Sequence, residues 1–146
     1  MKEIRTEINI KASPEKAWQV LTDFNSFSQW NPFIRQINGH PEVGTKLEIH
    51  LQTPSGKNRT YRTTVTKIEP NHELRWYGKS LIPGMFNGER IFTIEPLNTD
   101  YTRFIHREIF TGLGAVLAAN RLDKDMYHSF EKMNNAFKKK VEQTAK

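Results

Sequence analysis

Three residues of this sequence are well suited to chemistry, namely His106, Glu108 and Arg90, and they lie among large apolar residues in two segments of alternating pattern. In a β-strand, residues two positions apart point to the same face, so a face that carries Phe104 and Phe110 also carries His106 and Glu108. In the preceding segment, Arg90 shares a face with two apolar residues, Phe92 and Ile94. The alternation therefore predicts a polar cluster on the wall of an apolar cavity.

This cluster has two interpretations, one functional and one structural. A buried Glu108 beside His106 could act as an acid–base pair, or could grip a ligand hydroxyl or carboxylate. Alternatively, Arg90 and Glu108 form a structural ion pair between neighbouring strands, with His106 hydrogen-bonded to it.

The apolar pattern alone does not decide which face of the last alternating segment, residues 101–110, points into the protein. Ile105 and Ile109 make the face opposite His106 nearly as apolar. That opposite face would bury Arg103 and Arg107, and burying a charge is costly unless it is paired. We therefore expect the face of His106 to point inward.

Familiar signatures of catalysis and cofactor binding are missing from the sequence. It contains no Gly-x-Ser-x-Gly elbow, no phosphate-binding loop and no His-Glu-x-x-His, and its five histidines never stand at metal-ligand spacing. The run 112–114 (Gly-Leu-Gly) lacks the third glycine of a dinucleotide fingerprint and is followed by no further strand. We expect no metal and no cofactor, and we interpret Gly112 as a residue that allows a sharp turn.

The elements that position the cluster follow from hydrophobic periodicity and turn residues. A strand at 2–10 precedes a helix that begins at Ser13-Pro14-Glu15, a cap followed by proline and an acidic residue, and a second short helix ends at Asn31-Pro32. Six further strands are expected at residues 33–39, 45–52, 59–69, 72–81, 88–95 and 101–110. Short connections make these strands antiparallel neighbours, so we expect a single α+β domain over residues 1–146.

A long helix in the stretch 111–146 is expected to cover one face of the sheet. Its apolar residues recur at spacings of three and four: Leu122, Met126, Phe130, Met133, Phe137 and Val141. Towards its start the same stripe consists of alanines (Ala115, Ala118 and Ala119), which either leave room for a ligand or allow the helix to approach the sheet more closely.

Composition limits the classes of function. The sequence contains no cysteine, which excludes disulfides and thiolate metal sites and fits a reducing compartment. Its first residues are charged where a signal peptide needs an apolar core, and no apolar run could span a membrane, so we expect a cytoplasmic protein without integral membrane association. The net charge of +6 is scattered, and its one run, Lys138 to Lys140, suits the end of a helix, so we expect no nucleic-acid partner.

Several motifs together resemble the SRPBCC superfamily: Ser13-Pro14-Glu15-Lys16-Ala17-Trp18, Trp30-Asn31-Pro32-Phe33, Trp76-Tyr77-Gly78 and the run from His106 to Gly112. Within it, the chain is similar to the polyketide cyclase/dehydrase and lipid-transport group, relatives of START domains and the birch pollen allergen. The resemblance implies a helix-grip fold, in which a seven-stranded antiparallel sheet curls around a long C-terminal helix and encloses a ligand cavity. The superfamily contains lipid carriers, hormone receptors, ring cyclases and chaperone activators, so fold alone does not fix function.

From this resemblance and the aromatic content, we expect a small hydrophobic or aromatic ligand, lipid-like or polyketide-like, between the sheet and the last helix. The residues expected to contact it are Trp30, Phe33, Tyr61, Trp76, Phe86, Arg90, Phe92, His106, Glu108, Phe110, Leu117, Asn120 and Tyr127. The apolar loop 82–86 is expected to act as a lid or entrance.

Two other functions stay open. One is an enzyme of the cyclase, aromatase or dehydratase type, in which Glu108 and His106 would be catalytic. The other is a protein-interaction module like the chaperone activators. In each case we expect a monomer or a homodimer.

Overall fold

The computed structural model describes residues 1–53, 56–79, 87–112 and 119–145, and in its last segment it describes side chains from residue 126 onward. The elements follow in the order β1 (Lys2–Ile10), α1 (Pro14–Thr22), the 3₁₀ turn η1 (Phe24–Ser26), α2 (Phe27–Trp30), β2 (Ile34–Asn38), β3 (Lys46–Gln52), β4 (Asn58–Glu69), β5 (Glu73–Lys79), β6 (Asn87–Pro96), β7 (Thr102–Thr111) and α4 (Ala119–Thr144). Every predicted strand is present, and where both ends are described the boundaries differ from the prediction by one residue at most.

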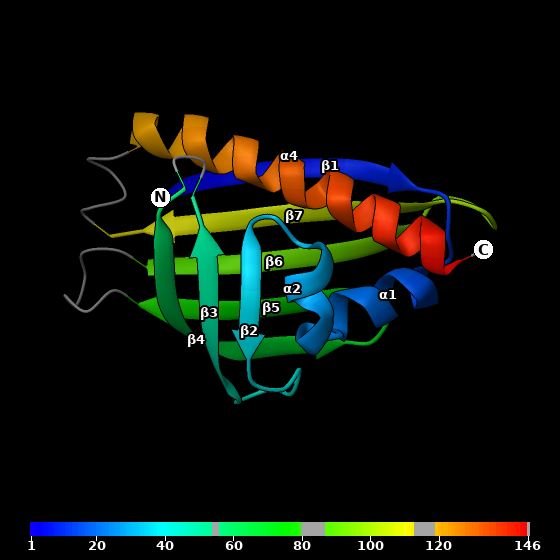
Figure 1. Ribbon diagram of the computed structural model, residues 1–146, viewed down its shortest axis with the longest axis horizontal. Coiled ribbons are helices and arrows are strands. Elements are labelled where there is room, and N and C mark those ends of the chain that lie inside the picture. The colour runs from blue at the N-terminus through cyan, green and yellow to red at the C-terminus, as the bar shows by residue number, and fades with distance from the viewer. Residues whose placement is uncertain (54–55, 80–86, 113–118, 146) are drawn as a thin grey trace.

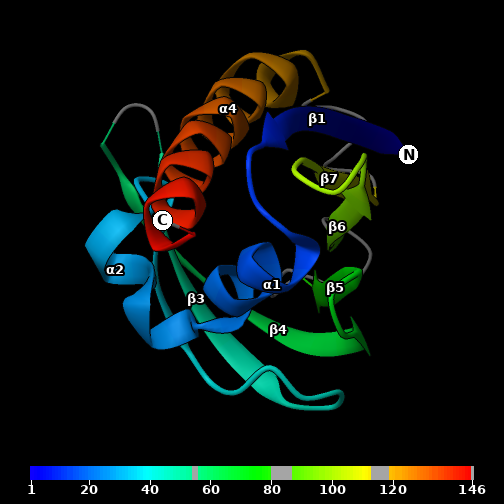
Figure 2. The same cartoon turned by 90° about the vertical axis from the view of Figure 1, so that its right-hand side faces the viewer.

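The strands form one antiparallel sheet, which within the described residues has seven strands in the order β1-β7-β6-β5-β4-β3-β2. From β2 onward successive strands pair, as their short connections require, whereas β1 pairs with β7. Figure 2 shows the sheet curling from β1 round to β3, with α4 across the open side and α1 and α2 near one end. The α+β helix-grip prediction is confirmed.

Local sequence signals explain how α1 and β2 begin. Ser13 caps α1 by accepting a hydrogen bond from the Lys16 amide at 3.3 Å, and Pro14 occupies the first turn, where it costs no hydrogen bond. At the other end of the helical pair, the buried Asn31 side chain accepts hydrogen bonds from the amides of Phe33 at 2.9 Å and Ile34 at 2.8 Å. Asn31 thereby fixes where Phe33 enters the sheet.

The last helix is held against the sheet by its apolar stripe, because Phe130, Met133, Phe137 and Val141 are fully buried. Burying a large apolar side chain contributes about 1.5–3 kcal/mol, so these residues dominate the stability of the helix on the sheet. The alanines at 115 and 118, expected either to leave room for a ligand or to allow closer packing, lie outside the described residues, and Ala119 lies in α4 where side chains are not described. Gly112 has φ +99, as a sharp turn after β7 requires.

The edge strand β1 lies beside α4 (Figure 1). Hydrogen bonds also hold the helix to this side of the sheet. Asn134 donates to the Thr6 hydroxyl at 2.8 Å, and the Lys138 ammonium donates to the Asn9 carbonyl at 2.9 Å. Near the end of the helix, the Lys11 amide donates to the Glu142 carboxylate at 2.9 Å. The helix is therefore anchored along β1.

The predicted inward face of β7 is confirmed. His106 and Glu108 are buried, whereas Arg103 and Arg107 remain partly exposed on the outer face and pair with Glu95 and Glu3. Ile105 is also buried, which explains why the apolar pattern alone was ambiguous.

Candidate functional site

The centre of the inner face is an ion pair between Arg90 and Glu108, which oppose each other in the register of β6 and β7. Arg90 Nη2 lies 2.7 Å from Glu108 Oε2, and both residues are buried. The distance is that of an ion pair, although Oε2 has no partner that meets hydrogen-bond geometry within the described residues. A Cβ atom at Gly88 would lie 2.5 Å from Glu108 Oε1, so glycine at that position leaves space for the carboxyl group.

His106 extends this pair into a closed hydrogen-bond network. Its Nε2 lies 2.8 Å from Arg90 Nη1, and its Nδ1 lies 3.1 Å from Asn134 Oδ1. Because a guanidinium only donates and an amide oxygen only accepts, His106 is neutral with its proton on Nδ1. Asn134 then donates to Thr6, whose hydroxyl donates to the His106 carbonyl at 3.1 Å. We call Thr6, Arg90, His106, Glu108 and Asn134 the inner cluster.

Aromatic rings enclose the inner cluster. The His106 ring stacks on Phe130 at 4.0 Å between centroids with an interplanar angle of 3°, and it contacts Phe92 at 4.7 Å. The Arg90 guanidinium lies over the rings of Phe130 at 4.9 Å and Phe33 at 5.2 Å. These contacts remove the cluster from water and strengthen its electrostatic interactions.

The enclosure changes the protonation equilibria of the cluster. Burial lowers the pKa of His106 well below its usual value of 6.5, and the Arg90 charge lowers it further. Burial raises the pKa of Glu108 above 4.5, although the Arg90 charge opposes this rise. Burial also lowers the pKa of Arg90, against the opposing effects of Glu108 and Tyr61, but a guanidinium stays charged. His106 therefore cannot take a proton on Nε2 without losing its bond from Arg90, and Glu108 is the member of the cluster better able to exchange one.

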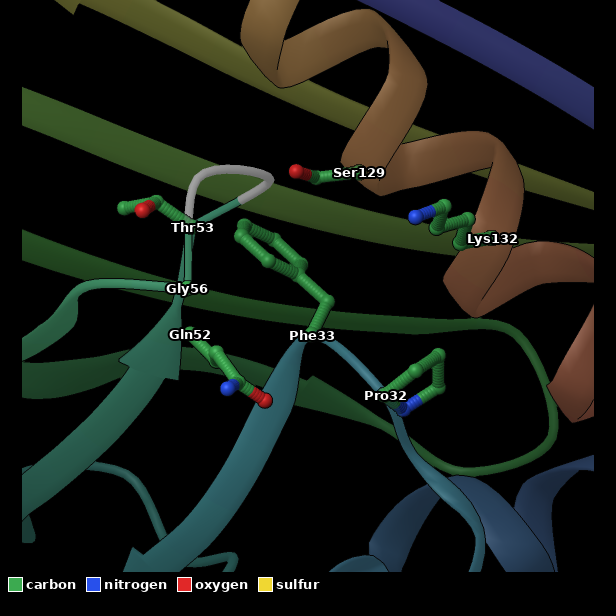
Figure 3. Close-up of a pocket in the computed structure, with 7 residues that line it drawn as sticks. All are labelled: Pro32, Phe33, Gln52, Thr53, Gly56, Ser129 and Lys132. Atoms are coloured by element: carbon green, nitrogen blue, oxygen red, sulfur yellow. The ribbon is translucent and has the colours of Figure 1, made fainter.

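The second region is a pocket of about 240 Å³ between α4 and the end of the sheet formed by β2 and β3 (Figure 3). Its lining residues come from the α2–β2 connection, the end of β3, the turn after β3, and α4: Pro32, Phe33, Gln52, Thr53, Gly56, Ser129 and Lys132. Figure 3 shows Ser129 and Lys132 extending from α4 towards the side on which Phe33 lies. We call this space the seam pocket.

The seam pocket and the inner cluster meet at Phe33. This residue is only 2% exposed, lines the pocket and also carries the Arg90 guanidinium on its ring. Ser129 is 3% exposed, whereas Gln52 and Lys132 are exposed at the mouth. The pocket thus has an aromatic inner wall and a polar rim.

The other predicted ligand residues lie in different surroundings. Trp76, Phe92 and Phe110 are buried on the inner face of the sheet, beside or near the cluster. Tyr61 also belongs to the inward face of β4, opposite Ile49, yet it is 48% exposed. The inward-facing surface is therefore accessible to solvent at Tyr61.

Two predicted contacts lie away from the inner cluster, and three fall outside what is described. Trp30 packs on Phe27 at 5.0 Å and Phe137 at 5.7 Å, and Tyr127 is 47% exposed on α4. Phe86, Leu117 and the predicted lid at 82–86 lie outside the described residues, and Asn120 lies in α4 where side chains are not described. Their roles stay predictions.

Asn134 and most of the pocket lining were not predicted from the sequence. Asn134 interrupts the apolar stripe of α4 four residues after Phe130, and a polar residue at that position signals a buried hydrogen-bonding partner. Among the missed lining residues are Gln52, Ser129 and Lys132, which carry no such signal because they lie beside the apolar stripes of their elements.

The described part of the chain contains neither a candidate metal site nor a helix that could span a membrane. The described residues contain no group of three or more His, Cys, Asp or Glu side chains that could hold a metal ion. None of the described helices is both long enough and apolar enough to span a membrane.

Comparison with known proteins gives a family and a fold. A family profile described as polyketide cyclase / dehydrase and lipid transport matches residues 1–142. No curated protein matches the chain.

Among solved structures, the Zhui aromatase/cyclase from Streptomyces sp. R1128 is 14% identical with a TM-score of 0.82, over 99% of this chain and 96% of that one. A START superfamily protein from Mycobacterium smegmatis is 20% identical with a TM-score of 0.72, over 99% of each chain. The di-domain aromatase/cyclase StfQ of the steffimycin pathway is 12% identical with a TM-score of 0.79, and this chain spans 52% of it. At these identities the structural matches show the fold alone.

Proposed function

This chain belongs to the polyketide cyclase/dehydrase and lipid-transport family, and we propose that it binds a small hydrophobic or aromatic molecule between the sheet and α4. The observation that carries this proposal is the seam pocket, whose inner wall is the buried ring of Phe33. Pockets that combine apolar walls with a few polar groups are typical of small-molecule sites.

The state of the inner cluster favours binding over catalysis by His106. Both ring nitrogens of His106 are engaged, by Arg90 and by Asn134, and burial keeps the imidazole neutral. A general base needs a free lone pair within reach of a substrate proton. The cluster therefore serves to hold the wall behind Phe33 in place.

A second candidate function is proton transfer by Glu108 in a cyclase, aromatase or dehydratase reaction. It is favoured by the raised pKa of this buried carboxyl group, which makes Glu108 a better proton donor near neutral pH than an exposed glutamate. If Glu108 acts in this way, Glu108→Gln abolishes turnover of a poly-β-ketone substrate but leaves binding of a neutral aromatic probe intact. Equal turnover in the wild type and the variant would exclude it.

Binding is tested with the neutral fluorescent probe N-phenyl-1-naphthylamine. We expect saturable binding to the folded protein, with the largest amide shifts in two-dimensional NMR spectra at Phe33, Gly56, Ser129 and Lys132. Absence of saturable binding, or shifts confined to the outer face of β5 to β7, would overturn the proposal.

A pair of serine variants tests the location. Ser129→Leu adds an apolar side chain to the pocket and should weaken probe binding by about tenfold or more, which corresponds to about 1.4 kcal/mol. Ser28→Leu makes the same change at an exposed position of α2 outside the pocket, and should leave binding unchanged. Thermal melts are needed to check that each variant is folded at the assay temperature. Equal binding by Ser129→Leu and the wild type would place the probe elsewhere.

A further inference from the structure

The charge of the seam pocket is unbalanced. Of its seven described lining residues, Lys132 is the only charged one. Its ammonium group forms no ion pair or hydrogen bond with any residue that the structure describes. In contrast, Lys138 of the same helix is fully engaged, by the Glu142 carboxylate at 2.6 Å and the Asn9 carbonyl at 2.9 Å. The pocket thus presents a cation to whatever enters it.

A second cation lies near the same wall but is already matched. The Arg90 guanidinium packs on the Phe33 ring from the inner cluster, and Glu108 lies 2.7 Å from its Nη2 while His106 accepts from its Nη1. An anion placed there would have to compete with the Glu108 carboxylate. The unmatched positive charge therefore lies at the mouth of the pocket and not at its inner wall.

The apolar surface of the pocket lies deeper than the charge. The Phe33 ring is buried, whereas Lys132 is exposed and extends from α4 on the side where Phe33 lies (Figure 3). An occupant that satisfied the two features together would place an apolar or aromatic body against Phe33 and a negative group beside Lys132. A neutral occupant would leave the cation unmatched, and a small inorganic anion would leave the aromatic wall uncovered.

We propose that the ligand of the seam pocket is an amphipathic organic anion, such as a carboxylate on an aromatic or aliphatic body, with its charge at Lys132 and its body on Phe33. The inference rests on the proposed function, because it names the class of molecule that the pocket binds. Its charged group stays near solvent, so the gain is that of a charge-assisted hydrogen bond at a partly exposed site, a factor of about 3 to 10 in affinity.

The test uses two probes with the same phenylaminonaphthalene skeleton. N-phenyl-1-naphthylamine is neutral, and 8-anilinonaphthalene-1-sulfonate adds one sulfonate that stands in for the anionic group of the ligand. Dissociation constants for each are measured by fluorescence titration with the wild type, Lys132→Gln and Lys132→Arg. The matched control is Lys139→Gln, which removes the same charge from the same helix two turns away, at an exposed residue outside the pocket lining.

We expect the wild type to bind the sulfonate about 3 to 10 times more tightly than the neutral probe at low ionic strength, with the preference falling as salt is added. Lys132→Gln should remove the preference of the protein for the sulfonate over the neutral probe, Lys132→Arg should retain it, and Lys139→Gln should behave like the wild type. A preference that survives in Lys132→Gln, or equal affinity for the two probes in the wild type, would overturn the inference and leave the proposed function standing. Failure of the neutral probe to bind would instead overturn the proposed function itself.

Discussion

The inner cluster and the seam pocket share the ring of Phe33, yet they satisfy their polar groups in opposite ways. In the inner cluster each nitrogen of the His106 ring has a partner, and Arg90 has a carboxylate opposite it. In the seam pocket the Lys132 ammonium has no partner within the described residues, and it lies exposed over an aromatic wall. One helix, α4, supplies residues to each region.

This difference separates stability from binding. Removing one partner of a buried polar group lowers the free energy of unfolding, because the group that remains is buried without its hydrogen bond or ion pair. Such groups therefore stabilise the fold. An exposed group without a partner contributes little to folding and is available to a ligand. We therefore expect substitutions in the inner cluster to lower stability, and substitution of Lys132 to affect ligand binding with little effect on stability.

The largest effect is expected when Arg90 is replaced by methionine, which keeps most of the volume but removes the charge. Glu108 would then be buried without a counter-ion, and it would have to take up a proton to stay buried. At neutral pH the loss is at most about 3 kcal/mol, because each pH unit above the usual pKa of 4.5 costs about 1.4 kcal/mol and the raised pKa of Glu108 in the wild type already carries part of this cost. Urea denaturation measures the loss.

The same mechanism predicts how this loss depends on pH. The unfolded chain takes up the proton more readily as pH falls towards 4.5, so the deficit of Arg90→Met should shrink in acid. The control Arg62→Met changes an exposed arginine of β4 and should alter stability by no more than about 0.5 kcal/mol. A deficit that is constant between neutral pH and pH 4.5 would show that lost packing, and not the unpaired carboxylate, is the cause.

A smaller effect is expected from Asn134→Ala, which removes the link between α4 and the cluster. The Nδ1 proton of His106 would lose its acceptor in a buried site, at a cost of about 1–3 kcal/mol. Asn135→Ala is the matched control, because it makes the same change at the next, exposed position and reports the gain in helix propensity alone. If the two variants were equally stable, the Asn134 bonds would contribute nothing to the anchoring of α4.

Much of the inner cluster could be predicted from the sequence, because its geometry follows from alternation along strands. Phe104 and Phe110 indicated which residues share a face with His106, and the cost of burying Arg103 and Arg107 decided between the two faces. Pairing of Arg90 with Glu108 followed once the two strands were neighbours. Asn134 was missed because an isolated polar residue in a helix does not reveal which strand it will meet.

The seam pocket could not be predicted in the same way. Gln52, Ser129 and Lys132 come from segments far apart in the sequence, and their proximity depends on how far α4 lies from the β2–β3 end of the sheet. Hydrophobic periodicity predicts which face of a helix packs on the sheet. It does not predict how far the neighbouring side of the helix, which here carries Ser129 and Lys132, lies from the strands at the edge of the sheet. Phe33 was predicted as a ligand contact because of its aromatic character, and it is the one predicted ligand residue in the described pocket lining.

The neutral state of His106 predicts a distinct pH dependence. Burial holds the pKa of folded His106 below 6.5, so as pH falls the unfolded chain binds a proton at a higher pH than the folded chain does. The contribution of neutral His106 to the free energy of unfolding is therefore fully present above pH 6.5 and is lost as pH falls. Between about pH 7.5 and about pH 5.5 this contributes a loss on the order of 1 kcal/mol. The variant His106→Gln lacks this titration, and its stability should fall by that much less over the same range.

The charged neighbours of His106 do not cancel this effect. Arg90 stays charged throughout the range, and Glu108, whose folded pKa is raised, contributes with the opposite sign: its stability is present below pH 4.5 and is lost as pH rises. Glu108 is present in the wild type and in His106→Gln, so the difference between their pH profiles isolates the histidine. Parallel profiles would mean that His106 takes up a proton as readily in the folded protein as in the unfolded chain, contrary to the donor pattern of the cluster.

The smallest effect on stability is expected from Lys132→Gln, the variant that should matter most for an anionic ligand. Lys132 is exposed and unpaired within the described residues, so its removal breaks no buried contact and should change the free energy of unfolding by less than about 0.5 kcal/mol. Denaturant titrations without ligand measure this directly. A loss comparable to that of Asn134→Ala would mean that Lys132 stabilises the packing of α4. The contrast between a structural inner cluster and a seam pocket that is available to a ligand would then not hold, because it depends on Lys132.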